Sequence, residues 1–286
     1  MGTVLTVMNM KGGVGKTTVA CHLAGMAARE NLGRAGPSRV LLIDYDPQFN
    51  ASQMYLPSRT YFRLEEEHKT TLAILMDNSA LSDPFSLQNI TEFPPPRPSS
   101  IIHNVSGGGA SVLDIIPSTL GLMYVALGQP GRSLQLMRDR FSSFINQVRL
   151  AYDLVILDCH PAGSVFTQSS LAVSNHVLIP VRPDNFAVRG LALMKQFIEG
   201  RGPLSPTVTP HILFNLTGAN SSTEENNIRL HKDYGPMCIR HSLRDRSFYR
   251  KPNLGKNFVW DRRVAYQPRA MENLRRVCTD IMARIM

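Results

Sequence analysis

The sequence is poor in several features that define common protein classes. It has only four cysteines among 286 residues, and they lie far apart, without the close spacing of metal ligands. No apolar run approaches the roughly 20 residues that span a bilayer, and the N-terminus has no basic start followed by an apolar stretch and a cleavage site. We therefore expect a soluble cytoplasmic protein with reduced cysteines, and neither a disulfide scaffold nor a membrane-spanning chain.

Acidic residues are also in short supply, with 22 Asp and Glu against 31 Lys and Arg, a formal net charge of +9. The excess is concentrated in residues 240–286, which hold twelve Lys or Arg and four Asp or Glu, a net charge of +8. The rest of the chain is nearly neutral. A basic C-terminal region on a neutral body predicts a polyanionic partner, and we favour nucleic acid over a merely solvated basic face.

A glycine-rich segment stands between a strand-like run and a helix-like run. Residues 10–18 read Met-Lys-Gly-Gly-Val-Gly-Lys-Thr-Thr and follow the apolar residues 4–8. Such a turn surrounds a phosphate with backbone N–H groups at the positive end of a helix. Lys16 can then reach the β- and γ-phosphates of a nucleotide, and the Thr17 hydroxyl can bind magnesium. The predicted nucleotide-binding residues of this loop are Lys11, Gly12, Gly13, Val14, Gly15, Lys16, Thr17 and Thr18.

The loop departs from the strict pattern G-x-x-x-x-G-K-[ST], because Met10 replaces its first glycine and Lys11 adds a second lysine. In this form it resembles the deviant Walker A motif of the ParA/MinD family of ATPases, which includes DNA-partition proteins. The resemblance implies that Lys11 reaches across a dimer to the partner's nucleotide and acts in catalysis with Lys16. It covers residues 1–56 strongly, 111–200 well and 205–286 more loosely.

Carboxylates follow two more apolar runs. Asp44 and Asp46 come at the end of the run that contains residues 41–43, and Asp158 follows the run 154–157, as in a Walker B motif. Ligands of open α/β sheets bind at the carboxyl ends of the strands. By the resemblance, Asp46 orients or activates the attacking water and has a catalytic role. Asp44 supports the magnesium shell, and Asp158 holds magnesium through a water beside Thr17.

Two further residues stand at family positions. His160 replaces a proline in the usual D-C-P-P segment, and we interpret it as a tolerated loop substitution rather than a contact to phosphate or to a partner. Asn215 ends a strand-like run, where an asparagine recognises adenine in related P-loop ATPases.

The pattern of the chain predicts an α/β fold, with a mostly parallel twisted sheet and helices on both faces, as in a Rossmann-like P-loop NTPase. We expect one domain over residues 1–286, with an irregular insertion at about 57–110 that holds proline and glycine clusters. The expected strands are 3–8, 39–44, 111–116, 152–158, 176–181, 211–215 and a short 237–241. The expected helices are 16–31, 71–76, 120–126, 133–149, 166–172, 188–199 and 268–286.

The basic C-terminal region resembles the ParA stretch that carries DNA-contacting residues. The predicted DNA-binding residues are Arg244, Arg246, Arg250, Lys251, Arg262 and Arg263. The last helix has an apolar stripe, which we expect to pack on the sheet rather than on a membrane, because it lacks aromatic residues suited to the bilayer interface.

The resemblance implies a ParA-type ATPase with ATP and Mg²⁺ as cofactors. Its ATP-bound homodimer would bind double-stranded DNA of the nucleoid without sequence preference. A ParB-like, centromere-binding activator would stimulate ATP hydrolysis during partition of a plasmid or chromosome. Two alternatives stay open. One is a MinD-like, membrane-cycling ATPase that regulates division or envelope assembly. The other is a ParA-like ATPase that positions a protein cargo.

Overall fold

The computed structural model describes most of the chain. The described residues are 1–30, 38–76, 93–105, 111–127, 132–160, 165–200, 207–218, 222–245, 247–250, 252–261 and 268–286.

A seven-stranded sheet forms the centre of the molecule, with the order β3-β4-β2-β5-β1-β6-β7. All neighbouring strands are parallel except β3, which pairs antiparallel with β4. This arrangement confirms the predicted α/β class. The strands are β1 (Thr3–Val7), β2 (Arg39–Tyr45), β3 (His103–Asn104), β4 (Val112–Ile116), β5 (Leu154–Cys159), β6 (His176–Val181) and β7 (Thr209–Phe214).

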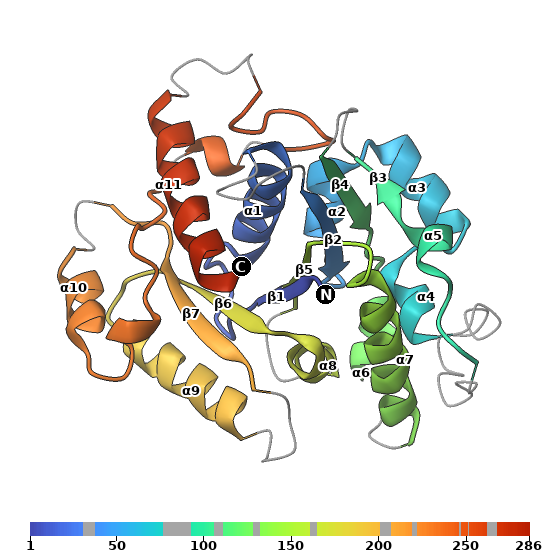
Figure 1. The fold of residues 1–286 in the computed structure, drawn as a ribbon, viewed down its shortest axis with the longest axis horizontal. Helices are drawn as coiled ribbons and strands as arrows, with labels where there is room; N and C mark the ends of the chain where they lie inside the picture. Colours follow the sequence, from blue (N-terminus) through green and yellow to red (C-terminus); the bar gives the residue numbers. More distant parts are fainter. Residues whose placement is uncertain are drawn as a thin grey trace.

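Helices cover both faces of the sheet, and in Figure 1 α1 and α11 lie above it while α7, α8 and α9 lie below. The upper layer contains α1 (Lys16–Glu30), α2 (Asn50–Tyr55), α3 (Ser58–Glu66), the short 3-10 helix η4 (Ser247–Arg250) and α11 (Pro268–Ile285). The elements packed into the core of the other face are α4 (Thr71–Leu75), α5 (Pro98–Ile101), α6 (Leu122–Leu127), α7 (Arg132–Val148), α8 (Val165–Val173), α9 (Ala187–Glu199), α10 (Ser222–Leu230) and η3 (Gly235–Met237).

Successive side chains of each strand point alternately to the two faces of the sheet, so they divide the core into two layers. In β2, Val40 and Leu42 pack beneath α1, whereas Leu41 and Ile43 pack on the opposite side. All four are fully buried, because successive side chains of a strand point to opposite faces and both faces are covered. Apolar runs without polar alternation are therefore the sequence signature of these strands.

The segment predicted to be irregular contains two helices in its first part. The expected helix 71–76 is confirmed as α4 (Thr71–Leu75), whereas α3 (Ser58–Glu66) was not predicted. Leu72, Ile74 and Leu75 of α4 are buried in the main core. The expected strand 237–241 does not form, and this prediction is wrong: Cys238 makes only an isolated bridge to Ile212. The Ile239 N–H donates to the Ile212 carbonyl of β7 (2.8 Å), and side chains bind other backbone groups of this segment, as described below.

The last helix packs as predicted. Leu274, Val277 and Ile281 of α11 are at most 2% exposed and join the core shared with α1. Among the helices within the described ranges, none combines the length and the apolar character needed to cross a bilayer.

Candidate nucleotide site and basic segment

The glycine-rich loop lies between the end of β1 and the start of α1. Asn9 braces its entrance, since its Nδ2 donates to the Pro180 carbonyl (2.8 Å) and its Oδ1 accepts the Lys11 N–H (3.0 Å). Gly13 and Gly15 have φ of 73° and 83°, values that favour glycine. A Cβ at Gly15 would lie 2.4 Å from Nδ2 of Asn215. The loop therefore requires glycine for its backbone shape and for this close approach.

Lys16 is the first residue of α1, and its side chain is largely buried. Its Nζ donates to the Lys11 carbonyl at 3.3 Å. Burial lowers the pKa of Lys16, while the nearby carboxylates of Asp158 and Asp46 oppose that shift. The ammonium group therefore sits between the glycine-rich loop and two acidic strand ends, where a bound phosphate would meet it.

Asp44 and Asp158 are register partners at the ends of β2 and β5, and Val7 of β1 pairs with Asp158 on its other side. Burial raises the pKa of Asp158, and the neighbouring Asp44 adds to the effect. Burial likewise raises the pKa of Asp44 to about 7, against hydrogen bonds from Ser52. Two buried carboxyl groups side by side disfavour full ionisation unless a cation neutralises them.

A magnesium ion fits this arrangement. The Thr17 hydroxyl is hydrogen-bonded to Asp158, and Oδ2 of Asp158 is buried with no hydrogen-bond partner. In the described part of the chain, no cluster of three or more His, Cys, Asp or Glu residues could hold a metal. Magnesium commonly takes one or two protein oxygens and completes its shell with phosphates and water. Thr17 and Asp158 suit that mode of binding.

Asp44 and Asp46 differ in what they contact. Oδ2 of Asp44 accepts both the N–H (2.8 Å) and the hydroxyl (2.6 Å) of Ser52. Asp46 accepts the Gln48 N–H through Oδ1 (2.9 Å), and its carbonyl accepts the Ser118 hydroxyl (2.6 Å). Asp44 thus anchors α2, whereas Asp46 belongs to the loop beside Lys16. The predicted roles of both residues in catalysis and metal binding stay predictions.

Lys11 is exposed and paired within its own chain. Its Nζ lies 2.5 Å from Oδ2 of Asp184, and Oδ1 of Asp184 accepts the Phe186 N–H at 3.0 Å. Partial burial opposes ionisation of Asp184, but these two donors hold its pKa below the usual value. Phe186 is 70% exposed. Asp184 therefore links the proposed partner-reaching lysine to the backbone of a residue with an exposed aromatic side chain.

Asn215 and His160 have different surroundings. Nδ2 of Asn215 donates to the Val14 carbonyl at 2.8 Å, which ties the end of β7 to the glycine-rich loop. Its predicted contact with adenine stays a prediction. The backbone N–H of His160 donates to the Tyr45 carbonyl (3.3 Å), and its ring meets Phe166 edge-on. The loop after His160, at 161–164, lies outside the described residues.

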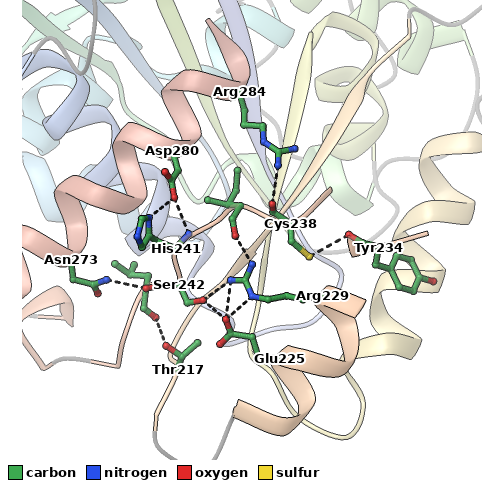
Figure 2. A network of polar contacts seen from close by, with 12 residues as sticks. Thr217, Glu225, Arg229, Tyr234, Cys238, His241, Ser242, Asn273, Asp280 and Arg284 are labelled. Carbon is green, nitrogen blue, oxygen red and sulfur yellow. Dashed lines mark hydrogen bonds and ion pairs between the residues drawn. The ribbon is translucent and has the colours of Figure 1, made fainter. Parts of the chain in front are cut away.

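Beyond β7, residues 238–244 are held by side chains from α10 and α11 (Figure 2). Arg229 and Arg284 donate to the carbonyls of Ile239 (2.9 Å) and Cys238 (3.2 Å). These bonds take backbone acceptors that a β-ladder would otherwise use, which explains why the expected strand 237–241 is missing.

The following residues are fixed in the same way. Asp280 accepts the backbone N–H (2.8 Å) and Nδ1 (2.7 Å) of His241. Asn273 donates to the Ser242 carbonyl (3.0 Å) and accepts the Arg244 N–H (3.0 Å). Figure 2 shows these contacts converging from α11 on one side of the segment. The segment that presents Arg244 is therefore rigidly supported although it is not a regular element.

The basic side chains gather around a cavity of about 910 Å³ between this segment and α11. Among its lining residues are Arg240, Arg244, Arg269, Arg275 and Arg276. Arg275 and Arg276 form ion pairs with acidic residues. Within the described residues, no ion pair involves the other three arginines. Sequence reasoning missed Arg240 and Arg269, although both belong to the basic C-terminal region.

The predicted DNA-binding residues are only partly visible. Arg244 and Arg250 are exposed, and Arg250 pairs with Asp245. The other four, Arg246, Lys251, Arg262 and Arg263, lie outside the described residues. Sequence reasoning also gave no role to Asn9, Ser52, Ser118 or Asp184, which position the loop and the carboxylates. Asn9 could have been noticed as the single polar residue between strand and loop.

Comparison with known proteins gives a consistent family. The family model of an AAA domain matches residues 2–201. The chain is 32% identical over 207 residues to the chromosome partitioning protein ParA of Caulobacter vibrioides, an alignment that covers 71% of this chain and 65% of the relative. The chain thus spans about 65% of the length of this relative.

Solved structures share the fold over nearly the full length. The ATP complex of Cyanothece McdA superposes with a TM-score of 0.67 at 17% identity, covering 98% of this chain and 96% of that one. The structure of pNOB8 ParA bound to nonspecific DNA superposes with a TM-score of 0.62 at 18% identity, covering 100% and 99%.

Proposed function

The chain belongs to the ParA/MinD family of P-loop ATPases, and from this premise we propose that it is a DNA-partition ATPase. It binds ATP with magnesium at residues 11–18 and closes as a homodimer. The dimer binds duplex DNA without sequence preference. A ParB-like, centromere-binding partner stimulates hydrolysis, and the moved cargo is a plasmid or a chromosome.

One observation carries this proposal: Lys16, Thr17, Asp46 and Asp158 come together where three adjacent strands end. Buried Lys16 interacts electrostatically with the carboxylates of Asp158 and Asp46, and Thr17 is hydrogen-bonded to Asp158. A lysine, a hydroxyl and two carboxylates beside a glycine-rich loop are the parts that phosphoryl transfer from ATP requires. In support, the Cyanothece McdA structure of the same fold is an ATP complex.

Each residue has a defined task in this reaction. Lys16 binds oxygens of the γ-phosphate, and Asp46 accepts a hydrogen bond from the attacking water and orients it. The bond between the γ-phosphorus and the oxygen of ADP breaks, so the products are ADP and inorganic phosphate. Thr17 and Asp158 hold magnesium, which neutralises charge on the phosphate oxygens when it is bound.

Lys11 has its task in the dimer. Its ion pair with Asp184 is exposed, so it is screened by solvent and can exchange for a stronger partner at little cost. A γ-phosphate presented by the second subunit is such a partner, because it carries more charge than a carboxylate. Exposed Phe186 lies next to Asp184 and would be covered by the same association.

The basic segment supplies the DNA contacts. Arg240, Arg244 and Arg269 line one cavity. The segment that carries Arg240 and Arg244 is held by side chains of α10 and α11. Arginines of this kind bind backbone phosphates, which gives affinity without base recognition. The pNOB8 ParA structure on nonspecific DNA supports the assignment. A MinD-like membrane cycle is disfavoured, because the apolar stripe of α11 is buried in the core.

Two variants test the nucleotide cycle. Asp46→Ala retains the phosphate contacts but loses water positioning, so we expect a stable dimer with ATP and magnesium, with turnover lowered by roughly 100-fold or more. Lys11→Ala should bind ATP, dimerise weakly and hydrolyse slowly. Light scattering and phosphate release measure both properties. If Asp46→Ala stays monomeric or turns over normally, or if Lys11→Ala hydrolyses like wild type, the proposed cycle is wrong.

A further inference from the structure

A short segment of the basic region is mounted directly on the helix that follows Asp44 and Asp46. We propose that residues 252–261, the coupling segment, transmit the state of the nucleotide site to the DNA-binding region through α2, and transmit bound DNA back to the nucleotide site. This inference rests on the proposed function and adds the route by which its two sites communicate.

The first step of the route joins the nucleotide site to α2. The Ser52 hydroxyl donates to Asp44 (2.6 Å) and accepts the Ser118 N–H (2.9 Å), and the Ser52 N–H also donates to Asp44 (2.8 Å). Ser52 and Asp44 are fully buried. Because these bonds join α2 to the carboxylate beside Asp158, a displacement of the strand-end carboxylates on nucleotide binding would carry α2 with it.

The second step joins α2 to the coupling segment. The N–H groups of Leu254 and Gly255 donate to the carbonyls of Gln53 (2.8 Å) and Met54 (2.9 Å) at the C-terminal end of α2. Gly255 has a φ of 75°, and a Cβ there would lie 2.9 Å from the Tyr55 carbonyl. The contact therefore depends on glycine both for its backbone conformation and for its closeness.

Aromatic packing fixes the rest of the segment to α1 and α2. Phe258 lies against Tyr55 (4.8 Å between ring centroids) and stacks on Trp260 (4.7 Å). Trp260 covers Gly25 of α1 so closely that a Cβ there would lie 2.2 Å from its ring. The guanidinium of Arg29, also in α1, lies over the Trp260 ring, with Cζ 5.6 Å from the ring centroid. The coupling segment is therefore packed on the helix that begins at Lys16 as well as on α2.

The same segment carries basic charge to the surface. Lys256 is exposed, and its backbone exchanges two hydrogen bonds of 3.0 Å with Asn253 in the turn that contacts α2. In Figure 1 this orange-red stretch passes over the end of α1 toward α2. Among the residues that the structure describes, the hydrogen bonds from this turn to α2 come from backbone groups, which leaves the exposed Lys256 side chain available to a phosphate.

Such a connection has a thermodynamic consequence. If ATP changes the affinity for DNA by a given factor, DNA must change the affinity for ATP by the same factor. Couplings of this kind are typically about 5- to 150-fold. The segment should carry a large share of that factor, because it is packed against both α1 and α2.

Two adjacent substitutions separate coupling from charge. Gly255→Ala keeps every charge but strains the turn and crowds the Tyr55 carbonyl. Lys256→Ala removes one charge but keeps the turn and its hydrogen bonds. For Gly255→Ala, we expect the DNA affinities measured with ATP and with ADP to differ by no more than about threefold. For Lys256→Ala, we expect a lower DNA affinity in both states, with the same ratio of the two affinities as in the wild type.

Trp260 provides a readout that needs no change in the segment, because it is the only tryptophan of the chain. Its emission in wild-type protein should differ between ATP and ADP, and change again when duplex DNA is added to the ATP form. Lys16→Ala, which cannot hold ATP, serves as the control and should show no ATP response.

The outcomes are distinct. Equal Trp260 emission with ATP and with ADP overturns the proposed coupling, even if Gly255→Ala fails to fold. A folded Gly255→Ala whose ratio of DNA affinity with ATP to DNA affinity with ADP equals that of the wild type overturns it as well. A lowered ratio of these affinities in Gly255→Ala, together with an unchanged ratio in Lys256→Ala, supports it. Failure of the proposed function has another signature: wild-type protein that binds no ATP, or no DNA in any nucleotide state.

Discussion

The nucleotide site and the basic segment are held in place by different means. At the nucleotide site, Val7, Asp44 and Asp158 are register partners on adjacent strands, so the sheet itself fixes their positions. In residues 238–244 there is no comparable ladder, and side chains such as Arg229 and Asp280 bind the backbone from distant elements. The first region inherits its geometry from a repeating pattern, and the second depends on a set of individual contacts.

One substitution should abolish the function of the nucleotide site. Lys16→Ala should lose ATP binding, because the loop is left without the cation that meets the phosphates. Removing one partner of a buried charged contact commonly costs about 3 kcal/mol or more, which is roughly a 100-fold loss of affinity. ATP titration by calorimetry measures it. Lys69→Ala, which removes a half-buried lysine paired with Glu67, is the control and should bind ATP normally. Wild-type ATP affinity in Lys16→Ala would refute the loop assignment.

The basic side should be altered separately from the nucleotide side. Arg240→Glu with Arg244→Glu should weaken DNA binding by tenfold or more and lower the salt slope by about two units, roughly one for each lost phosphate contact. ATP binding should be unchanged, since both residues lie outside the loop. DNA binding measured over a salt series decides this.

A matched control corrects for net charge. Arg59→Glu with Arg63→Glu makes the same charge change on exposed positions of α3. If both double variants lose DNA affinity equally, the cavity arginines have no special role and only overall charge matters.

The last prediction concerns stability rather than binding, at the packing of α1 against the basic C-terminal region. His22 of α1 packs against Tyr249, Phe258 and Trp260. Burial lowers its pKa from 6.5 to about 4, against a hydrogen bond to the Thr18 carbonyl. The unfolded chain therefore binds more protons than the folded one between these values. The stabilisation is complete above about pH 6.5 and is lost as the pH falls toward 4.

A pH series of unfolding measurements tests this. From pH 7 to pH 5 the free energy of unfolding should fall by about 2 kcal/mol through His22 alone. His22→Leu should be less sensitive to acid by a similar amount. Some sensitivity should remain, because burial also lowers the pKa of His211 to about 4. An unchanged pH dependence in His22→Leu would show that His22 is not held neutral.

The same difference between the regions decides what the sequence could predict. The expected strands 39–44 and 176–181 match β2 (Arg39–Tyr45) and β6 (His176–Val181) closely, because doubly covered parallel strands are continuous apolar runs. The strand ends placed Asp44 and Asp158 correctly for the same reason.

Elements with few apolar residues escaped prediction. Among the described side chains, α3 buries only Tyr61 and Leu64, and α10 contributes only Ile228 to the core, so neither has a clear helical period in its sequence. The anchors Asn273 and Asp280 could not be recognised either, because each binds backbone about 30 or more residues away. Such contacts leave no local pattern in the sequence.

The central claim is that ATP bound at the strand ends controls DNA binding by the basic region. The most direct test is the affinity of the wild-type chain for a random duplex with ATP, with ADP and without nucleotide, at low and moderate salt, with anionic liposomes measured in parallel. We predict tight, salt-sensitive DNA binding with ATP alone and no liposome binding. DNA binding that is absent or independent of nucleotide, or ATP-dependent binding to liposomes in its place, would contradict the account.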